Sequence, residues 1–179
     1  YNNPSYYGLR ANTLKISKLE LKAIADFIGE EIPWSQDGFY YDINQRPAKS
    51  TLYHAGLYYI QEPSAMAVVN NIDIQPGMKV LDICAAPGGK TINIASKLKG
   101  EGLLVSNDIN NQRTKAILKN IELYGVSNAL ITNENHHVLE KVFPEFFDRI
   151  ILDAPCSGEG MFRKDEDLIK SWERSVIET

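Results

Sequence analysis

The feature that most constrains the fold is a regular alternation of apolar and amphipathic segments that begins near Glu62. Three stretches have helical patterns, at residues 63–72, 90–100 and 111–125. Four short apolar stretches fit strands: "KVLDICA", "GLLVSNDI", "NALITNEN" and "FDRIILDAP". A nearly wholly apolar strand such as "KVLDICA" is typical of a parallel sheet that is covered on both faces. The alternation therefore predicts an α/β fold with a doubly wound, Rossmann-like parallel sheet.

Residues 1–60 have a different pattern and predict a small α+β lobe. Ser17 and Glu20 have the spacing of a capping box at the start of a helix, and the apolar positions 21, 24, 25 and 28 give that helix one face. The segments "GFYYDI" and "TLYHAGLYYIQE" are interpreted as extended. We therefore expect an N-terminal lobe over residues 1–60 and a second domain over residues 61–179.

Composition limits the possible classes of protein. The 179 residues carry a formal net charge of −4, which argues against a strongly basic surface for nucleic acid on this piece alone. The two cysteines, Cys84 and Cys156, have no metal-ligand or disulfide-motif spacing, so we expect no metal site and a reducing, cytoplasmic location. No apolar run reaches membrane-spanning length, so no membrane partner is expected.

In parallel sheets, ligands bind beyond the carboxyl ends of the strands, and here the first strand leads into "CAAPGGKT". A phosphate-binding P-loop needs glycine where Cys84 stands, and Pro87 removes a backbone donor from such a cradle. A dinucleotide loop needs GxGxxG, but Gly88 and Gly89 are adjacent with no third glycine at the right place. Both of these interpretations are weak.

A pocket for S-adenosylmethionine fits the residues better, because that cofactor has no pyrophosphate to cradle. Ala85, Ala86, Gly88 and Gly89 provide a loop of small residues against the amino-acid part of the cofactor. Asp108 ends the second strand and could accept hydrogen bonds from two ribose hydroxyls. The alternative for Asp108 is the N-cap of the following helix.

The fourth strand leads into "DAPCSGEGMFRKD", which begins at Asp153. A lone cysteine is often a small buried apolar residue. Cys156, however, follows a strand end and is flanked by Pro155 and a glycine-rich segment, which is typical of a loop that presents functional groups.

Together, "CAAPGGKT", "NDINNQR" and "FDRIILDAPCSGEG" resemble the Nol/Nop/Sun family of RNA cytosine-5 methyltransferases, and the bacterial ribosomal RNA enzymes in particular. "GLRANTLK" and "YYIQEPSAM" resemble the N-terminal lobe of that family and the entry to its catalytic domain. The resemblance implies methylation of cytosine C5 in RNA, above all in 16S-type ribosomal RNA. It also implies a cofactor site formed by Cys84, Ala85, Ala86, Pro87, Gly88, Gly89, Lys90, Asp108 and Asp153, with Asn135 at the position that in the family usually holds an acid near the adenine.

The resemblance also implies how the chemistry is shared. Cytosine C5 becomes nucleophilic when a cysteine thiolate adds to C6, and the target base must leave its stack to be reached. In the family, a Thr-Cys cysteine attacks and the Pro-Cys cysteine assists product release. Cys156 is expected to be the release cysteine, with the nucleophile beyond Thr179, whereas in a complete chain Cys156 would itself attack. Asp153 is expected at the base edge, and Lys90 either near the base or on the helix surface.

Three further expectations concern other partners and functions. Arg10 and Lys15 in the N-terminal lobe, and Arg163 and Lys164 after the Pro-Cys loop, are candidate RNA contacts, although a solvated face explains each group as well. His136 and His137 are expected to be a loop pair without ligand function. The alternative functions are another S-adenosylmethionine-dependent methyltransferase, acting on a base amine or a protein, or a non-catalytic fragment that binds cofactor or RNA.

Overall fold

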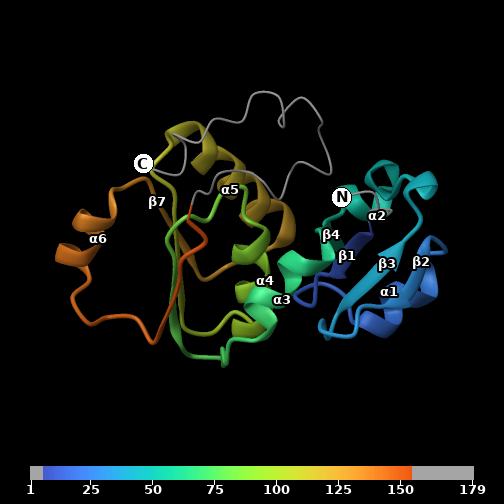
Figure 1. Ribbon diagram of the computed structural model, residues 1–179, viewed down its shortest axis with the longest axis horizontal. Helices are drawn as coiled ribbons and strands as arrows, with labels where there is room; N and C mark the ends of the chain where they lie inside the picture. Colours follow the sequence, from blue (N-terminus) through green and yellow to red (C-terminus); the bar gives the residue numbers. More distant parts are fainter. Residues whose placement is uncertain (1–5, 155–179) are drawn as a thin grey trace, which may run out of the picture. The chain divides into compact units, whose positions relative to one another are not determined.

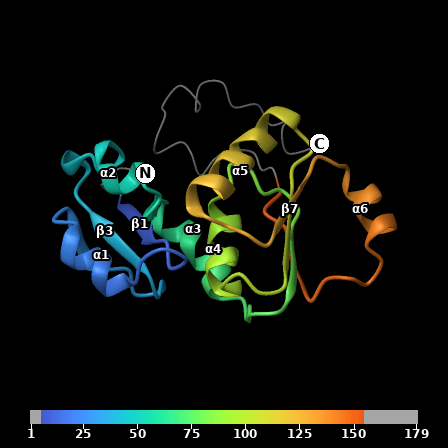
Figure 2. The same cartoon turned by 180° about the vertical axis from the view of Figure 1, so that it is seen from behind.

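The computed structural model describes residues 6–154, which form two sheets. The N-terminal lobe holds an antiparallel sheet of order β2-β3-β1-β4, and the following domain holds a parallel sheet of order β7-β6-β5-β8. Both parts of the predicted fold class, the parallel α/β sheet and the preceding α+β lobe, are confirmed. Figures 1 and 2 show the two sheets from opposite sides.

The N-terminal lobe begins with β1 (Tyr7–Ala11), which pairs with β3 (Gly38–Tyr41) and β4 (Tyr58–Ile60). Helix α1 (Lys18–Ile24) and β2 (Ile28–Glu31) lie between β1 and β3 in sequence. Two single 3-10 turns (Ile43–Gln45, Pro47–Lys49) and the short α2 (Thr51–His54) connect β3 to β4. The lobe buries its own apolar cluster, made of Leu9, Ala11, Leu21, Ala25, Phe39 and Tyr58.

The parallel sheet consists of β5 (Lys79–Asp82), β6 (Leu103–Asn107), β7 (Ala129–Thr132) and β8 (Arg149–Ile151). Helix α3 (Pro63–Asn70) precedes it, and α4 (Gly89–Leu98), α5 (Asn111–Tyr124) and α6 (His136–Val142) connect its strands. Helices α4 and α5 cover one face and α6 lies on the other (Figure 1). The strand order reverses between β5 and β8, which is the position where such sheets bind ligands.

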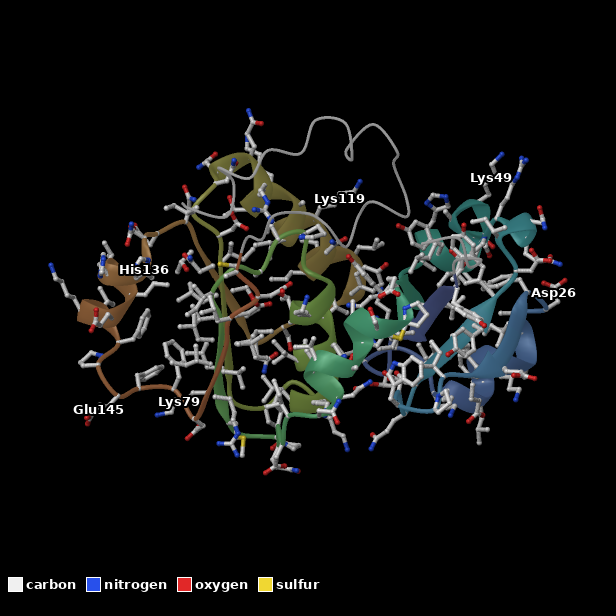
Figure 3. The ribbon with its side chains drawn as sticks, viewed as in Figure 1. Asp26, Lys49, Lys79, Lys119, His136 and Glu145 are labelled. Carbon is white, nitrogen blue, oxygen red and sulfur yellow. The ribbon has the colours of Figure 1, made fainter. Side chains whose placement is uncertain are left out.

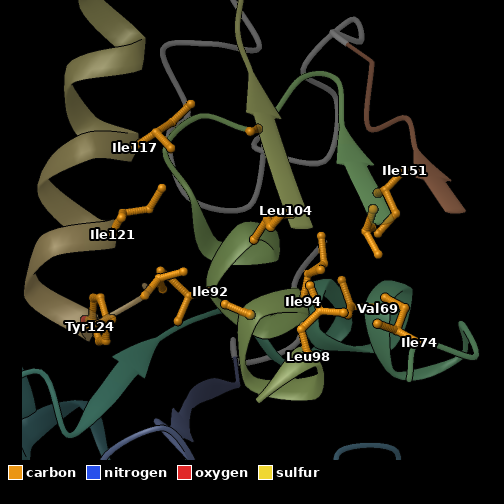
Figure 4. Close-up of a cluster of buried hydrophobic side chains, with 14 of the residues drawn as sticks. Val69, Ile74, Ile92, Ile94, Leu98, Leu104, Ile117, Ile121, Tyr124 and Ile151 are labelled. Carbon is orange, nitrogen blue, oxygen red and sulfur yellow. The ribbon is translucent and has the colours of Figure 1, made fainter. Parts of the chain in front are cut away.

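The main core lies between the sheet and the helices α3, α4 and α5. Figure 4 shows Leu104 and Ile151 from the strands facing Ile92, Ile94 and other apolar side chains of these helices. A smaller cluster on the opposite face joins Leu81 and Val105 to α6. Val80 of β5 joins the main core and Leu81 the smaller cluster, so β5 is covered on both faces, as expected for a central parallel strand.

The structure corrects several details of the predicted elements. The first part of "TLYHAGLYYIQE" is the helical turn α2 rather than extended chain, because the Ser50 side chain accepts the backbone N–H of Leu52 and caps the turn. Helix α4 ends at Leu98 rather than at the expected Gly100, since Lys99 takes the left-handed C-cap position. The apolar face of α1 is also narrower than expected, because Ile24 is about half exposed.

His136 and His137 do not lie in a loop. They form the first turn of α6, on which Figure 3 labels His136. The Asn135 side chain accepts the backbone N–H of His137. Within residues 6–154, no three histidine, cysteine or acidic side chains gather as they would around a metal ion.

Candidate active site

Three loops meet at the carboxyl edge of the parallel sheet, and Asn107 at the end of β6 ties them together. Its amide donates to the carbonyls of Ile83 (3.1 Å) and Glu134 (2.9 Å). Its side-chain oxygen accepts from the Thr132 hydroxyl and from the Glu134 backbone N–H. The backbone carbonyl of Asn107 accepts the N–H of Ala85. One buried side chain therefore sets the spacing of the segments that follow β5 and β7.

The loop after β5 contains the small residues that were predicted to face a cofactor. Ala85 and Ala86 are buried, Cys84 is half-buried and Pro87 is exposed; the Ala86–Pro87 peptide is cis. Gly88 has φ +112°, a backbone conformation that favours glycine, and it directly precedes the first turn of α4.

Two side chains of α5 hold this loop from outside. The Arg113 guanidinium donates to the Ala86 carbonyl (3.0 Å), and the Asn120 amide donates to the Pro87 carbonyl (2.7 Å). Both carbonyls therefore have partners within the protein. The sequence prediction did not single out Arg113 or Asn120, although Arg113 belongs to the quoted segment "NDINNQR".

The acid at the end of β6 holds the turn into α5 with one oxygen. Asp108 is 2% exposed, and its Oδ1 accepts the backbone N–H of Asn110 (2.9 Å). Its Oδ2 accepts no hydrogen bond from the described residues and lies 3.5 Å from Nη1 of Arg113. The N-cap of α5 is Asn110, so the expected alternative role of Asp108 as N-cap is wrong.

A second buried acid, Asp82, connects the end of β5 to α4. The Thr91 hydroxyl donates to Oδ2 of Asp82 (2.8 Å), and the Ser106 hydroxyl lies 3.3 Å from the Thr91 oxygen. This pairing joins the strand to the first turn of the helix, where the helix dipole favours a negative charge. Sequence reasoning treated Asp82 only as a strand residue, because nothing in the pattern reveals its partner on α4.

The remaining predicted residues lie in different surroundings. Lys90 is the second residue of α4 and is half-buried. Asn135 is exposed, and its side-chain oxygen is the N-cap of α6. Asp153 is exposed and follows the end of β8 by two residues. Cys156, Arg163 and Lys164 lie outside the described residues.

Arg10 was predicted as a candidate RNA contact, and its position contradicts this. The side chain is fully buried, 3.5 Å from the Asp37 carboxylate and 3.5 Å from the Gly89 carbonyl. Burial lowers the pKa of Arg10, and the neighbouring Asp37 opposes that effect. A guanidinium without solvent access does not reach an RNA phosphate, so Arg10 joins the two lobes instead.

Lys15 is exposed, but its ammonium group already donates hydrogen bonds within the protein. It donates to the carbonyls of Ala55 (3.0 Å) and Leu123 (2.6 Å), and the second of these belongs to the last turn of α5. A cation at a helix C-terminus is favourable. One donor of the ammonium group remains for another partner.

Comparison with known proteins identifies the family. Residues 69–178 match the model for "16S rRNA methyltransferase RsmB/F", and residues 1–63 match the model for the "N-terminal domain of 16S rRNA methyltransferase RsmF". The chain belongs to the RsmB/F family. The resemblance inferred from the three sequence motifs is thereby confirmed.

Individual relatives agree with this assignment. The ribosomal RNA small subunit methyltransferase F of Escherichia coli O139:H28 is 40% identical over 178 residues, which cover 94% of this chain. The match covers 37% of the relative, so the chain spans just over a third of its length. A methyltransferase homolog from Pyrococcus horikoshii is 32% identical with a TM-score of 0.77, and the match covers 94% of this chain and 56% of that chain.

A third relative supports the fold alone. The NSun6 protein of Pyrococcus horikoshii, solved with SFG, is 19% identical with a TM-score of 0.71, and the match covers 87% of this chain and 65% of that chain.

Among the described residues of the RsmB/F family chain, no helix is both long and apolar enough to cross a membrane.

Proposed function

We propose that the protein transfers a methyl group from S-adenosylmethionine to C5 of cytosine in RNA, with 16S-type ribosomal RNA as the substrate. The observation that carries this proposal is the edge of the parallel sheet. A loop of small residues and a buried acid end adjacent strands there, in a chain of the RsmB/F family.

The polar groups and small residues at this edge fit the cofactor. A ribose presents two hydroxyl donors, and Oδ2 of Asp108 accepts no hydrogen bond from the described residues. The loop after β5 carries only small side chains at Ala85, Ala86, Gly88 and Gly89, as expected for a loop that binds the amino-acid part. We assign cofactor binding to Asp108, Asn135, Asp153 and the segment Cys84, Ala85, Ala86, Pro87, Gly88, Gly89 and Lys90. S-adenosylmethionine, when bound, supplies an electrophilic methyl group.

The residues of the protein prepare the base for that methyl group. A cysteine thiolate adds to C6 of cytosine, and the electron pair of the C5–C6 bond moves to C5. Asp153 hydrogen-bonds the N3/N4 edge of the base and stabilises the adduct. After methyl transfer, a base accepts the C5 proton, the electron pair of the C5–H bond re-forms the C5–C6 double bond, and the C6–sulfur bond breaks and releases the thiolate. We assign Cys156 to this release step, and Lys90 to the base or to a nearby thiol, whose pKa a positive charge would lower.

The family nucleophile belongs to a Thr-Cys motif, which the 179 residues do not contain. The division of labour between two cysteines is therefore a property proposed for the full-length protein. We also propose that residues 1–60 form the N-terminal lobe, that residues 61–179 belong to the catalytic domain, and that the protein acts in the cytoplasm.

Methylation by the full-length protein tests the function. We expect the purified protein to transfer labelled methyl groups to unmodified 16S ribosomal RNA or small subunits, with the label recovered as 5-methylcytosine at a defined position. Heat-inactivated protein and fully modified RNA are the controls. Recovery of the label on a cytosine amine, or on protein, would show that the proposed reaction is wrong.

A variant of the full-length protein tests the role of Cys156. Cys156→Ser is expected to accumulate a covalent protein–RNA adduct, because attack and methyl transfer proceed while release is blocked. The adduct is measured as a slowly migrating band on a denaturing gel. If Cys156→Ser forms no adduct and is inactive, Cys156 is the nucleophile instead.

A further inference from the structure

A polar cavity of about 520 Å³ lies between the N-terminal lobe and the parallel-sheet domain. Its walls come from the segment after β1 and the start of α1, the turn between β2 and β3, the end of α3, the segment before β5, and α4 from its middle onward. The lining residues are Thr13, Lys18, Gln36, Asp37, Asn70, Ile74, Gln75, Pro76, Asn93, Ser96, Lys97 and Lys99. We call this cavity the interlobe pocket. Its volume is in the range of small-molecule binding sites.

The interlobe pocket borders α4 from its middle, at Asn93, to the residue after its end, at Lys99, whereas the candidate active site lies at its start. Helix α4 begins at Gly89, beside the predicted cofactor loop, and ends at Leu98. Its 10 residues, at 1.5 Å each, make the helix about 15 Å long. The lining of the pocket shares no residue with the predicted cofactor site.

Two amide groups in the interlobe pocket lack acceptors within residues 6–154. Asn93 is 2% exposed, and its side-chain Nδ2 has no hydrogen-bond partner in this part of the chain. Nδ2 of Asn70 is likewise buried, and none of the described residues accepts from it. A buried donor left without an acceptor is unfavourable, so such groups in native proteins call for a ligand or an ordered water.

The charges around the pocket favour an anion. Lys18, Lys97 and Lys99 line it, and Asp37 is the only acid among its described lining residues. Arg10 lies 3.5 Å behind Asp37 and offsets its charge, and the Ser35 hydroxyl also donates to this carboxylate. Lys18 pairs with Glu31, and Lys97 donates to the Ile72 carbonyl, yet an ammonium has three donors, so both keep donors for a ligand.

We propose that the interlobe pocket binds a phosphate group of the RNA substrate, remote from the site of methyl transfer. A phosphate offers several acceptor oxygens and a negative charge, which match the two amide donors and the lysines. The choice of RNA as the source of the phosphate rests on the proposed function. The pocket thus holds the RNA in position while another part of it enters the active site.

The test measures RNA affinity of the full-length protein by fluorescence anisotropy across a series of salt concentrations. Lys97→Gln combined with Lys99→Gln is expected to weaken binding of an unmodified 16S ribosomal RNA fragment about tenfold. The slope of log affinity against log salt should fall by about 0.7 for each phosphate of single-stranded RNA that the lysines no longer neutralise. Lys141→Gln on α6 is the matched control, since Lys141 is exposed and outside the pocket.

A second variant keeps the proposal falsifiable if the lysine variants fold poorly. Asn93→Asp removes an amide donor that has no acceptor among the described residues, and it places a carboxylate among the lysines. We expect it to weaken RNA binding, because its own charge replaces that of the phosphate. In both variants the Michaelis constant for RNA should rise, while kcat at saturating RNA and the cofactor Kd stay unchanged.

Three outcomes would overturn the proposal. The double lysine variant could behave like Lys141→Gln, which would indicate only a general effect of charge. Asn93→Asp could leave RNA affinity unchanged. Inorganic phosphate or adenosine monophosphate could bind in a manner that depends on Lys97 and Lys99 while RNA affinity does not, which would assign the pocket to a small phosphorylated ligand. If the wild type makes no 5-methylcytosine but the variants still bind RNA more weakly, the proposed function is wrong, whereas the proposed phosphate site in the pocket is supported.

Discussion

At the scale of single residues, the two neighbours Asn107 and Asp108 divide the work at the edge of the sheet. Asn107 uses both atoms of its amide to hold the loops after β5 and β7. Asp108 uses one oxygen to hold the turn into α5, and its other oxygen accepts no hydrogen bond from residues 6–154. The first residue therefore sets the shape of the site, and the second provides its recognition group.

Replacing Asp108 by Asn tests that recognition role. The amide oxygen can still accept the N–H of Asn110, so the turn into α5 should persist. The loss of the charged acceptor should raise the Kd for S-adenosylmethionine by about 10- to 100-fold, as expected for a hydrogen bond to a charged group. Calorimetric titration of the full-length protein measures this change. Asp26→Asn, at an exposed position, is the control, and an unchanged Kd for Asp108→Asn would remove Asp108 from the cofactor site.

At the scale of elements, the sequence predicted the helix caps, because a cap depends on residues that are close in sequence. The capping box at Ser17 and Glu20 is present as expected, and Gly125 closes α5 in a left-handed conformation. The strands β1 and β2 were not predicted, because their pairing with β3 is a contact between distant segments. The buried partners of Asp82 and Arg10 were missed for the same reason, since Thr91 and Asp37 meet them only in the folded chain.

The capping box gives a pH-dependent prediction. The side-chain and backbone hydrogen bonds to Ser17 lower the pKa of Glu20 below its ordinary value of 4.5. A carboxyl group with a lowered folded-state pKa stabilises the fold above pH 4.5, and this contribution is lost as the pH falls through the folded-state value. Ser17→Ala removes the largest cause of the shift. It should cost about 1 kcal/mol at neutral pH and lessen the loss of stability on acidification.

Urea unfolding of the full-length protein at several pH values measures both effects. Ser127→Ala is the matched control, because Ser127 is exposed and lies outside the helices. An equal pH dependence in Ser17→Ala and the wild type would show that Glu20 does not carry the effect.

At the scale of the described unit, the two lobes are joined by polar groups of the N-terminal lobe and the end of α5. The Asn12 amide donates to the carbonyls of Gly56 (2.8 Å) and Tyr124 (2.9 Å), and the Tyr124 hydroxyl donates to the Tyr58 carbonyl. Burial raises the pKa of Tyr124, which keeps this hydroxyl a neutral donor. The sequence could not predict this interface, because its partners are more than 60 residues apart.

Substitutions at two glycines with similar backbone conformations distinguish the contribution of the interface to stability from the cost of backbone strain. Gly56 (φ +69°) and Gly77 (φ +89°) both have left-handed conformations. A Cβ at Gly56 would lie 2.3 Å from the Leu123 carbonyl oxygen of α5, whereas at Gly77 no atom of the described residues lies within 4 Å. Gly77→Ala should cost about 1 to 2 kcal/mol from the backbone alone, and Gly56→Ala roughly 2 kcal/mol more.

Urea unfolding gives the two free energies, and hydrogen exchange shows where protection falls. We expect Gly56→Ala to reduce protection at the end of α5 and in the segment around Gly56, whereas Gly77→Ala leaves both unchanged. Equal costs for the two variants would mean that the close contact at Gly56 is not needed to join the lobes.

The buried Arg10 limits how proteins of this family can be recombined. Its side chain lies between Asp37 of its own lobe and the carbonyl of Gly89 in the other. Gly89 cannot gain a side chain freely, because a Cβ would lie 3.1 Å from Tyr59 and from Gln61. A chimera that exchanges the N-terminal lobe alone would pair an arginine from one parent with a loop shaped for another. The N-terminal lobe and the segment around Gly89 should therefore be exchanged together, and a functional chimera must take both from the same parent.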